Sequence, residues 1–381
     1  MIDTVILTIP RDKMRTLDDS QGLFQNWELE STGKGYKKYI KNTTKEETKR
    51  GLSFIKLTGY TRNDRRGGFT RNVNIEFSAT KLITNAINEP KEKDFSLEVS
   101  TLKQRLLDMG EVVALKDLQN AEVASFHPFK NIILSDGFTA TGVIRELHKI
   151  NVSKKFDLTG IKFANDGTSL QIHTKSHSIV FYDKIADLAK DSIKAIDKDQ
   201  TPQQKTLFDE IKKEQPALEV IRMEVRLSQK RKMKEILKKL ELVEKPVFAD
   251  IFKKDVCQKI VRWYWEEIIK GENLFLFELL NSPKRLLRKV LRNDRKIQPK
   301  HSVFLVGLSV LCKDDDGIRE LREILEKYTK QRNWYRFADG IKLLNSITNK
   351  KALYSWVKQI DDAINDFKSI TGSDIFPEKR E

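Results

Sequence analysis

Apolar and polar residues alternate over short stretches in the first 230 residues, a period of two that is typical of half-buried β-strands. The stretches that favour strands are 1–10, 36–41, 52–60, 71–77, 120–134, 158–164, 169–174, 178–182 and 221–227. Helical spacing predicts helices over 80–87, 96–109 and 140–150. Pro128 interrupts one strand candidate, and because proline has no amide hydrogen we expect a break or an edge strand there.

The pattern changes after Ser228, and from there almost every apolar residue follows a helical period. A basic amphipathic helix is predicted over 229–242, and a charged, mostly helical insertion over 185–215. The resulting fold class is α+β: a mostly antiparallel sheet with packed helices, followed by a helical C-terminal region. We place the boundary near residues 230–245 and therefore expect two domains, 1–230 and 231–381.

The chain carries 71 lysines and arginines against 55 acidic residues, a net charge of +16. A protein this basic typically binds a polyanion, with nucleic acid the first candidate and an anionic membrane surface the second. The alternative is a basic surface that is merely solvated. Two stretches are suited to phosphate contacts, one over 229–242 and one over 282–300. The candidate DNA-binding residues in them are Lys230, Arg231, Lys232, Lys284, Arg285, Arg288 and Arg292.

Cellular location is indicated by cysteine usage and by hydropathy. Cys257 and Cys312 are too few for a disulfide framework or a cysteine-based zinc site, which favours reduced thiols in a cytosol. The N-terminus has no basic segment before its apolar residues, as a signal peptide would. The longest apolar stretch, 302–312, is about half of the roughly 20 residues that a membrane helix needs. We therefore expect a cytoplasmic protein with no membrane partner.

The segment SIVFYDK, residues 178–184, is the most informative for chemistry. Alternation along a strand places Tyr182 and Lys184 on the same face. A tyrosine beside a lysine is suited to phosphodiester transesterification, because the phenolate attacks phosphorus while the cation neutralises charge on the transferring phosphate. The alternative interpretation is a structural tyrosine at the end of a strand.

Two further residues are candidates for a metal site. Glu224 lies between Arg222 and Arg226 in IRMEVRL, and its carboxylate could be a ligand for a hard cation such as Mg²⁺ or Mn²⁺ or a member of a salt-bridge ladder. The two arginines are candidate DNA contacts. His127 lies among apolar residues, where a buried hydrogen-bonded histidine is the alternative to a ligand.

Four segments occur here in the order found in a known family: MIDTVILTIP, VNIEFSATKLI, FYDK and IRMEVRLS. The chain resembles the replication initiation proteins of filamentous phages and related plasmids, the phage gene II type. The likeness covers most of residues 1–230 and extends more faintly into the helical tail through WYRFADGIKLL and ALYSWVKQI.

The resemblance implies a Rep-like nicking and joining endonuclease that initiates rolling-circle DNA replication. Such proteins nick one strand at an origin, become joined through tyrosine to the 5′ phosphate, and later rejoin the displaced strand. Tyr182 matches the nucleophile, Lys184 the lysine two residues on, and Glu224 the acid of the later strand. A divalent metal, Mg²⁺ or Mn²⁺, is implied as cofactor. Origin DNA, as duplex and single strand, and the host helicase and polymerase in a bacterial cytoplasm are implied as partners.

One strand departs from the family pattern. Related initiators carry two histidines around one hydrophobic residue, or an R-x-D sequence, on the metal-binding strand, whereas this chain has Ser125-Phe126-His127. Asp3 or Asp183 could complete the ligand set. Two other functions stay open: a non-enzymatic origin-binding initiator that melts DNA and recruits a host helicase, and a structural or RNA-binding protein with a generic basic surface.

Overall fold

The fold is taken from a computed structural model of the chain. It describes residues 1–17, 24, 26–33, 35–49, 53–63, 69–83, 88–150, 161–164, 167–174, 176–188, 218–269, 283–293, 297–312, 317–329, 332–348 and 356–375. The expected insertion over 185–215 lies outside these residues, apart from its first turn.

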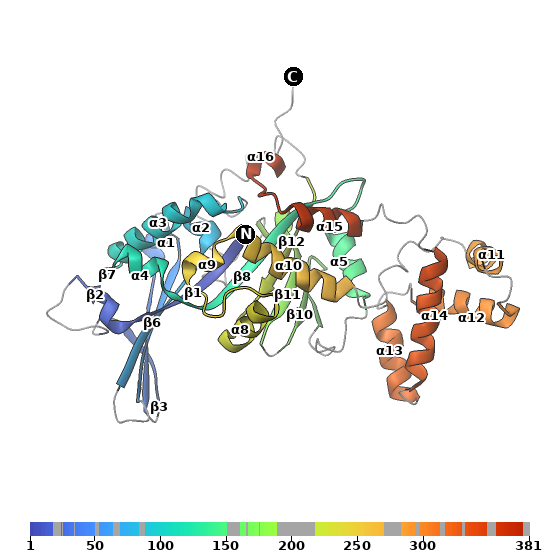
Figure 1. The fold of residues 1–381 in the computed structure, drawn as a ribbon, viewed down its shortest axis with the longest axis horizontal. Coiled ribbons are helices and arrows are strands. Elements are labelled where there is room, and N and C mark those ends of the chain that lie inside the picture. The colour runs from blue at the N-terminus through green and yellow to red at the C-terminus, as the bar shows by residue number, and fades with distance from the viewer. Residues whose placement is uncertain are drawn as a thin grey trace, which may run out of the picture.

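A ten-stranded sheet in the order β3-β4-β5-β6-β1-β8-β12-β11-β10-β9 forms the centre of the molecule (Figure 1). Every pair of neighbouring strands in it is antiparallel. The strands are β1 (Ile2–Pro10), β3 (Glu28–Gly33), β4 (Tyr36–Asn42), β5 (Ile55–Asn63), β6 (Phe69–Ser78), β8 (Glu122–Ile133), β9 (Ile161–Ala164), β10 (Ser169–His173), β11 (Ser178–Asp183) and β12 (Val220–Arg226). A separate two-stranded sheet pairs β2 (Met14–Thr16) with β7 (Glu111–Val113). The α+β class and the antiparallel sheet are thus confirmed.

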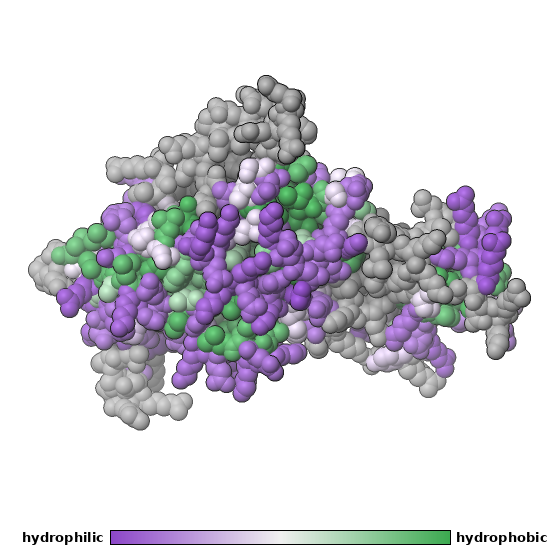
Figure 2. Space-filling view, turned by 45° about the horizontal axis from the view of Figure 1, so that its top comes forward, coloured by the Kyte–Doolittle hydropathy of each residue, from purple (hydrophilic) through white to green (hydrophobic). Residues whose placement is uncertain are grey.

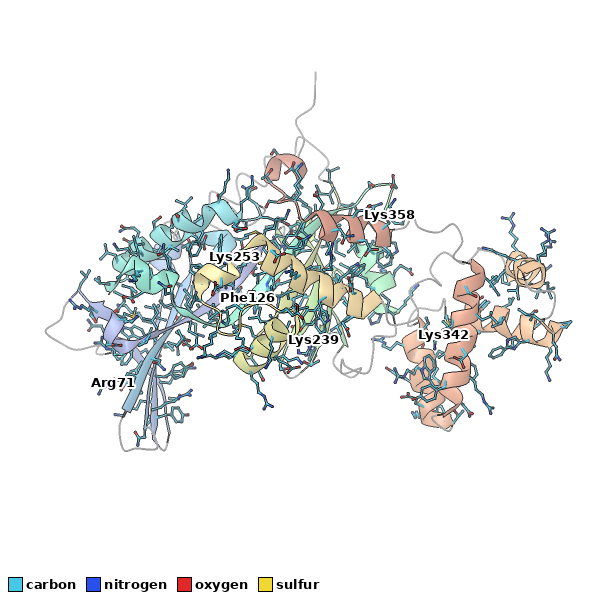
Figure 3. All side chains as sticks on the ribbon, viewed as in Figure 1. Arg71, Phe126, Lys239, Lys253, Lys342 and Lys358 are labelled. Carbon is cyan, nitrogen blue, oxygen red and sulfur yellow. The ribbon has the colours of Figure 1, made fainter. Side chains whose placement is uncertain are left out.

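Helices cover one face of the large sheet, because alternate strand residues on that face are apolar. These helices are α2 (Ala79–Ile83), α3 (Phe95–Asp108), α4 (Leu115–Gln119), α5 (Ala140–His148), α8 (Lys230–Lys239), α9 (Phe248–Ile251), α10 (Lys254–Ile269) and α15 (Trp356–Asp366). Phe126, labelled in Figure 3, is fully buried in this layer. Hydrophilic side chains cover much of the surface shown in Figure 2. The short segments α1 (Lys45–Lys49), α6 (Lys184–Leu188), α16 (Gly372–Ile375), η1 (Arg11–Lys13) and η2 (Glu92–Asp94) complete this part of the chain.

Four further helices form a core of their own, seen at the right of Figure 1. They are α11 (Pro283–Asn293), α12 (Pro299–Leu311), α13 (Gly317–Tyr328) and α14 (Arg332–Thr348). The elements described after residue 230 are all helical, yet α8, α9, α10 and α15 pack into the core of the sheet. The hydrophobic cores therefore divide between α10 and α11 and again between α14 and α15, instead of at residue 230.

Pro128 does not interrupt the sheet, so the expected break is wrong. β8 runs through it as a central strand, with β1 on one side and β12 on the other. The register of β1 shifts between Ile2 and Val5, opposite Pro128 and Phe126. A proline is tolerated at such an irregularity because the ladder there lacks a regular hydrogen bond that its nitrogen would have to donate.

Among the described residues, no helix has both the length and the apolar character needed to cross a membrane.

Candidate active site

The predicted chemical residues lie on the face of the sheet opposite the helical layer. In β12 the alternation places Ile221, Met223 and Val225 in the core. Arg222 and Glu224 therefore point to the other face. Cross-strand pairing aligns the neighbouring strands with them: Tyr182 of β11 pairs with Arg222, which in turn pairs with Asn131 of β8.

Tyr182 and Arg222 form the centre of the site. The guanidinium Nη1 of Arg222 donates to the Tyr182 hydroxyl at 3.3 Å and to Asp3 Oδ1 at 3.3 Å. Its Nε donates to Asn131 Oδ1 at 2.7 Å, and its plane stacks over the ring of Phe129 at 4.0 Å. These contacts fix the guanidinium in one orientation beside the hydroxyl.

Electrostatics around Tyr182 act in opposite directions. Burial raises the pKa of the Tyr182 phenol well above its usual value, whereas the positive charge of Arg222 lowers it. The nearby carboxylates of Glu224 and Asp3 raise this pKa further. The hydroxyl is therefore protonated near neutral pH, and Arg222 is the group of this site that favours the phenolate.

Lys184 lies beside Tyr182, although it does so from outside the strand, because β11 ends at Asp183, one residue beyond the predicted stretch 178–182. Lys184 begins helix α6, which Asp183 caps by accepting a hydrogen bond from the Ala186 amide at 2.9 Å. The Lys184 ammonium lies 5.8 Å from the Tyr182 ring centroid and 3.5 Å from Asp187 Oδ2. Burial, together with the charge of Arg222, lowers the pKa of Lys184 to about 8.

His127 and Glu224 are also brought together. His127 Nδ1 lies 3.4 Å from Glu224 Oε1, and Arg226 Nε donates to the same oxygen at 2.7 Å. Burial by itself raises the pKa of Glu224, but the hydrogen bonds from His127 and Arg226 outweigh it and hold this pKa well below its usual range. Glu224 is therefore an anion at any pH at which the protein would work.

This pair would fit part of a divalent metal site once the His127 proton is on Nε2, which leaves Nδ1 a lone pair for the cation. Two ligands of one cation, each about 2.1 Å from it, lie about 3 Å apart when they are adjacent. The carboxylate has lone pairs enough to accept from Arg226 and also bind a cation. Within the described part of the chain, no group of three or more His, Cys, Asp or Glu residues is placed to hold a metal. Mg²⁺ commonly uses one or two protein ligands and takes the rest from phosphate and water.

Neither aspartate considered from the sequence joins the pair. Asp3 accepts from Thr80 at 2.8 Å and from Arg222, and Asp183 caps α6. Sequence reasoning missed the residues that hold the arginine, Asn131 and Phe129. An asparagine inside the apolar run FKNII was the available signal, because a buried amide needs a partner.

The predicted DNA contacts fall into two groups. Arg222 is buried, so it acts on Tyr182 and not as a surface contact, whereas the side chain of Arg226 is 37% exposed. On α8, Lys230 pairs with Glu122 at 2.6 Å, Lys232 pairs with Glu235 at 2.6 Å, and Arg231 is exposed.

The residues predicted on α11 share one exposed surface. Leu286 and Val290 point into the helical core, and the charged side chains lie on the remaining surface of the helix. These exposed cations are Lys284, Arg285, Arg288 and Arg292, called here the α11 cations. A strip of this kind is suited to contacts with successive phosphates.

Comparison with protein-family models, with curated proteins and with solved structures finds no match to this chain.

Proposed function

We propose that the chain initiates rolling-circle DNA replication by nicking one strand through a covalent 5′-phosphotyrosine at Tyr182 and later rejoining it. One observation carries this proposal. The Tyr182 hydroxyl is held at 3.3 Å by a buried, oriented arginine, with a lysine beside its ring. The resemblance to filamentous-phage gene II type initiators supports the same function.

In the proposed reaction the Tyr182 oxygen loses its proton and attacks the scissile phosphorus. The new bond joins this oxygen to phosphorus, and the bond from phosphorus to the 3′ oxygen breaks. The leaving oxygen takes up a proton and becomes the free 3′-OH from which a polymerase extends. Reversal of these steps by another 3′-OH rejoins the strand and releases the tyrosine.

Arg222 and Lys184 have distinct roles in this scheme. Arg222 touches the hydroxyl and stabilises the phenolate as the proton leaves. Lys184, in its charged form, neutralises charge that develops on the phosphate. When bound at His127 and Glu224, Mg²⁺ or Mn²⁺ would withdraw electron density from the scissile phosphate.

The test uses labelled single-stranded oligonucleotides that tile the DNA around the gene. Purified full-length chain is incubated with each and with Mn²⁺ or Mg²⁺, and a denaturing gel resolves any DNA–protein adduct. We expect an adduct with one tile, which is lost with Tyr182→Phe and with chelator. An adduct that survives Tyr182→Phe would mean that another residue is the nucleophile.

A second candidate is a non-enzymatic initiator that binds the origin, melts it and recruits a host helicase. The α11 cations favour it, because they offer a duplex-binding surface on a helical core separate from the sheet. Tight binding to a duplex tile without any adduct, and plasmid replication that survives Tyr182→Phe, would support this candidate.

A further inference from the structure

The strand order of the large sheet reads as two equivalent halves. One half is β3-β4-β5-β6-β1 and the other is β8-β12-β11-β10-β9. In each half the first strand in the chain, β1 or β8, lies at the middle of the large sheet. The next four strands of the half pair with one another in sequence order, and the last of these four, β6 or β12, pairs with β1 or β8. β1 and β8 pair with each other in the middle. The two halves are therefore related by a pseudo-two-fold axis perpendicular to the sheet.

The strand register identifies which residues correspond. In the middle of the β1–β8 overlap, Val5 pairs with Phe126, and both point into the helical layer. Rotation about this point places β5 on β11 and β6 on β12. The row Tyr182–Arg222–Asn131 then corresponds to the row Tyr60–Asn72–Pro10, which pairs continuously across β5, β6 and β1. Rotation about an axis perpendicular to the sheet does not exchange the two faces of the sheet, so Tyr60 lies on the same face as Tyr182.

The first half keeps the tyrosine and its cation. The Arg62 guanidinium lies 5.1 Å from the Tyr60 ring centroid, and Arg62 follows the tyrosine by two residues, as Lys184 follows Tyr182. The acid–histidine pair is absent, because the positions equivalent to Glu224 and His127 are neutral. These equivalents are Asn74 and Ile6.

The surface around Tyr60 is polar and accessible. Tyr36 and Lys38 of β4 lie on the same face as Tyr60, because Tyr36 pairs with Arg62 and Lys38 pairs with Tyr60 across the two strands. The side chains of Tyr36 and Arg62 are exposed. The other face of the same strands is covered: the ring of Phe24 stacks on Tyr39 at 4.9 Å. Phe24 also packs on Gly59, where a Cβ would meet its ring at 2.1 Å.

We propose that this face of β4, β5 and β6 binds single-stranded DNA as a non-catalytic counterpart of the half that carries Tyr182. Tyr60 stacks on a base and Arg62 contacts a phosphate, whereas Lys38 is paired with Glu30 of β3 and is not assigned a phosphate. The two tyrosines lie five strand spacings apart across the sheet, about 24 Å, and their rows lie about ten residues, roughly 33 Å, apart along the strand direction, so a single DNA strand must cover about 40 Å to contact both. The inference uses the proposed function only to choose DNA as the nucleic acid.

The test measures binding of a labelled 30-nucleotide oligothymidylate by fluorescence anisotropy. All full-length variants carry Tyr182→Phe, which prevents covalent capture. We expect Tyr60→Leu to weaken binding about tenfold or more, and Arg62→Gln to weaken it severalfold and to reduce its salt dependence. Lys37→Gln is the matched control, because Lys37 is an exposed lysine of β4 whose position alternates to the opposite face.

Affinities within twofold of the parent for both variants, or an equal loss with Lys37→Gln, would overturn the inference. The inference would also be overturned if the two variants lost affinity for a labelled duplex but not for the oligothymidylate. Arg62 is exposed near the end of β5, so Arg62→Gln stays informative if Tyr60→Leu fails to fold. Adduct formation is measured separately with Tyr182 intact. Absence of an adduct together with Tyr60-dependent binding would reject the proposed function and retain this inference.

Discussion

Replacing Arg222 by methionine tests the residue that connects the strands of the site. The substitution keeps an apolar stem against Phe129 but removes every donor to Tyr182, Asn131 and Asp3. The buried Asn131 amide oxygen loses the hydrogen bond from Arg222 Nε, which costs about 1–3 kcal/mol. The Asp3 carboxylate, 24% exposed, also loses a partner, and its partial exposure limits that cost to about 1 kcal/mol. We expect a total loss of about 2–4 kcal/mol in the free energy of unfolding.

The rate of adduct formation in Arg222→Met should fall by more than the loss of folded protein explains. Loss of one oriented donor at a site of developing charge commonly reduces the rate by about 10²–10³. Without the arginine the pKa of Tyr182 also rises further, so the pH at which the adduct rate increases should move upward. Arg222→Lys, which keeps the charge but loses the fork, should recover part of the rate.

The assay combines urea unfolding, followed by tryptophan fluorescence, with single-turnover adduct formation across pH. Arg105→Met is the matched control, because Arg105 is a buried arginine of α3 that pairs with Asp108 at 3.0 Å in the helical layer, away from the face that carries Tyr182. An adduct rate for Arg222→Met within threefold of wild type, measured where the variant is folded, would refute the role assigned to Arg222.

Three other predictions concern pH, salt and stability. Tyr182 ionisation makes the adduct rate rise with pH, but a lysine is charged below its pKa and neutral above it, so this rise should level off near pH 8, and in Lys184→Arg, which stays charged, it should continue. A wild-type rate that keeps rising through pH 8 and is lost in Lys184→Arg would instead make the neutral amine a base. Replacing the α11 cations by glutamine should reduce the slope of log K against log salt for duplex binding by about 0.9 per charge, whereas an unchanged slope would exclude this helix from the interface. Lys130→Met should lower the free energy of unfolding in urea by about 3–5 kcal/mol, because it leaves the buried Glu89 carboxylate without the ammonium at 2.9 Å. Adding Glu89→Gln should restore part of that free energy, whereas a loss below about 1 kcal/mol in Lys130→Met would contradict this prediction.

The strands that could be predicted are those whose alternation is set by burial of one face. β1, β11 and β12 match the expected stretches because apolar residues at every second position have only one way to enter the core. Helix α3 was equally readable, because Leu102 and Leu106 repeat at helical spacing and Gly110 follows, with φ of +81°. β3 was missed, because its exposed sequence ELESTG carries no alternation of burial.

The parts that could not be predicted depend on contacts between residues far apart in the chain. The internal symmetry of the sheet arises from the pairing of β1 with β8, and the shared Tyr-x-cation spacing of Tyr60–Arg62 and Tyr182–Lys184 is too short to reveal it in the sequence. Arg222 looked like a surface cation because charged residues alternate with apolar ones in IRMEVRL. Its burial depends on Asn131, Phe129 and Asp3, which local sequence cannot bring together.

The identity of the residue that carries DNA tests the central claim most directly. The adduct formed with the reactive tile is digested with trypsin and nuclease, and mass spectrometry locates the nucleotide on the peptide. The account predicts a phosphodiester on the hydroxyl of Tyr182, with none on Tyr60. A nucleotide on Tyr60 or on any residue other than Tyr182 would contradict it.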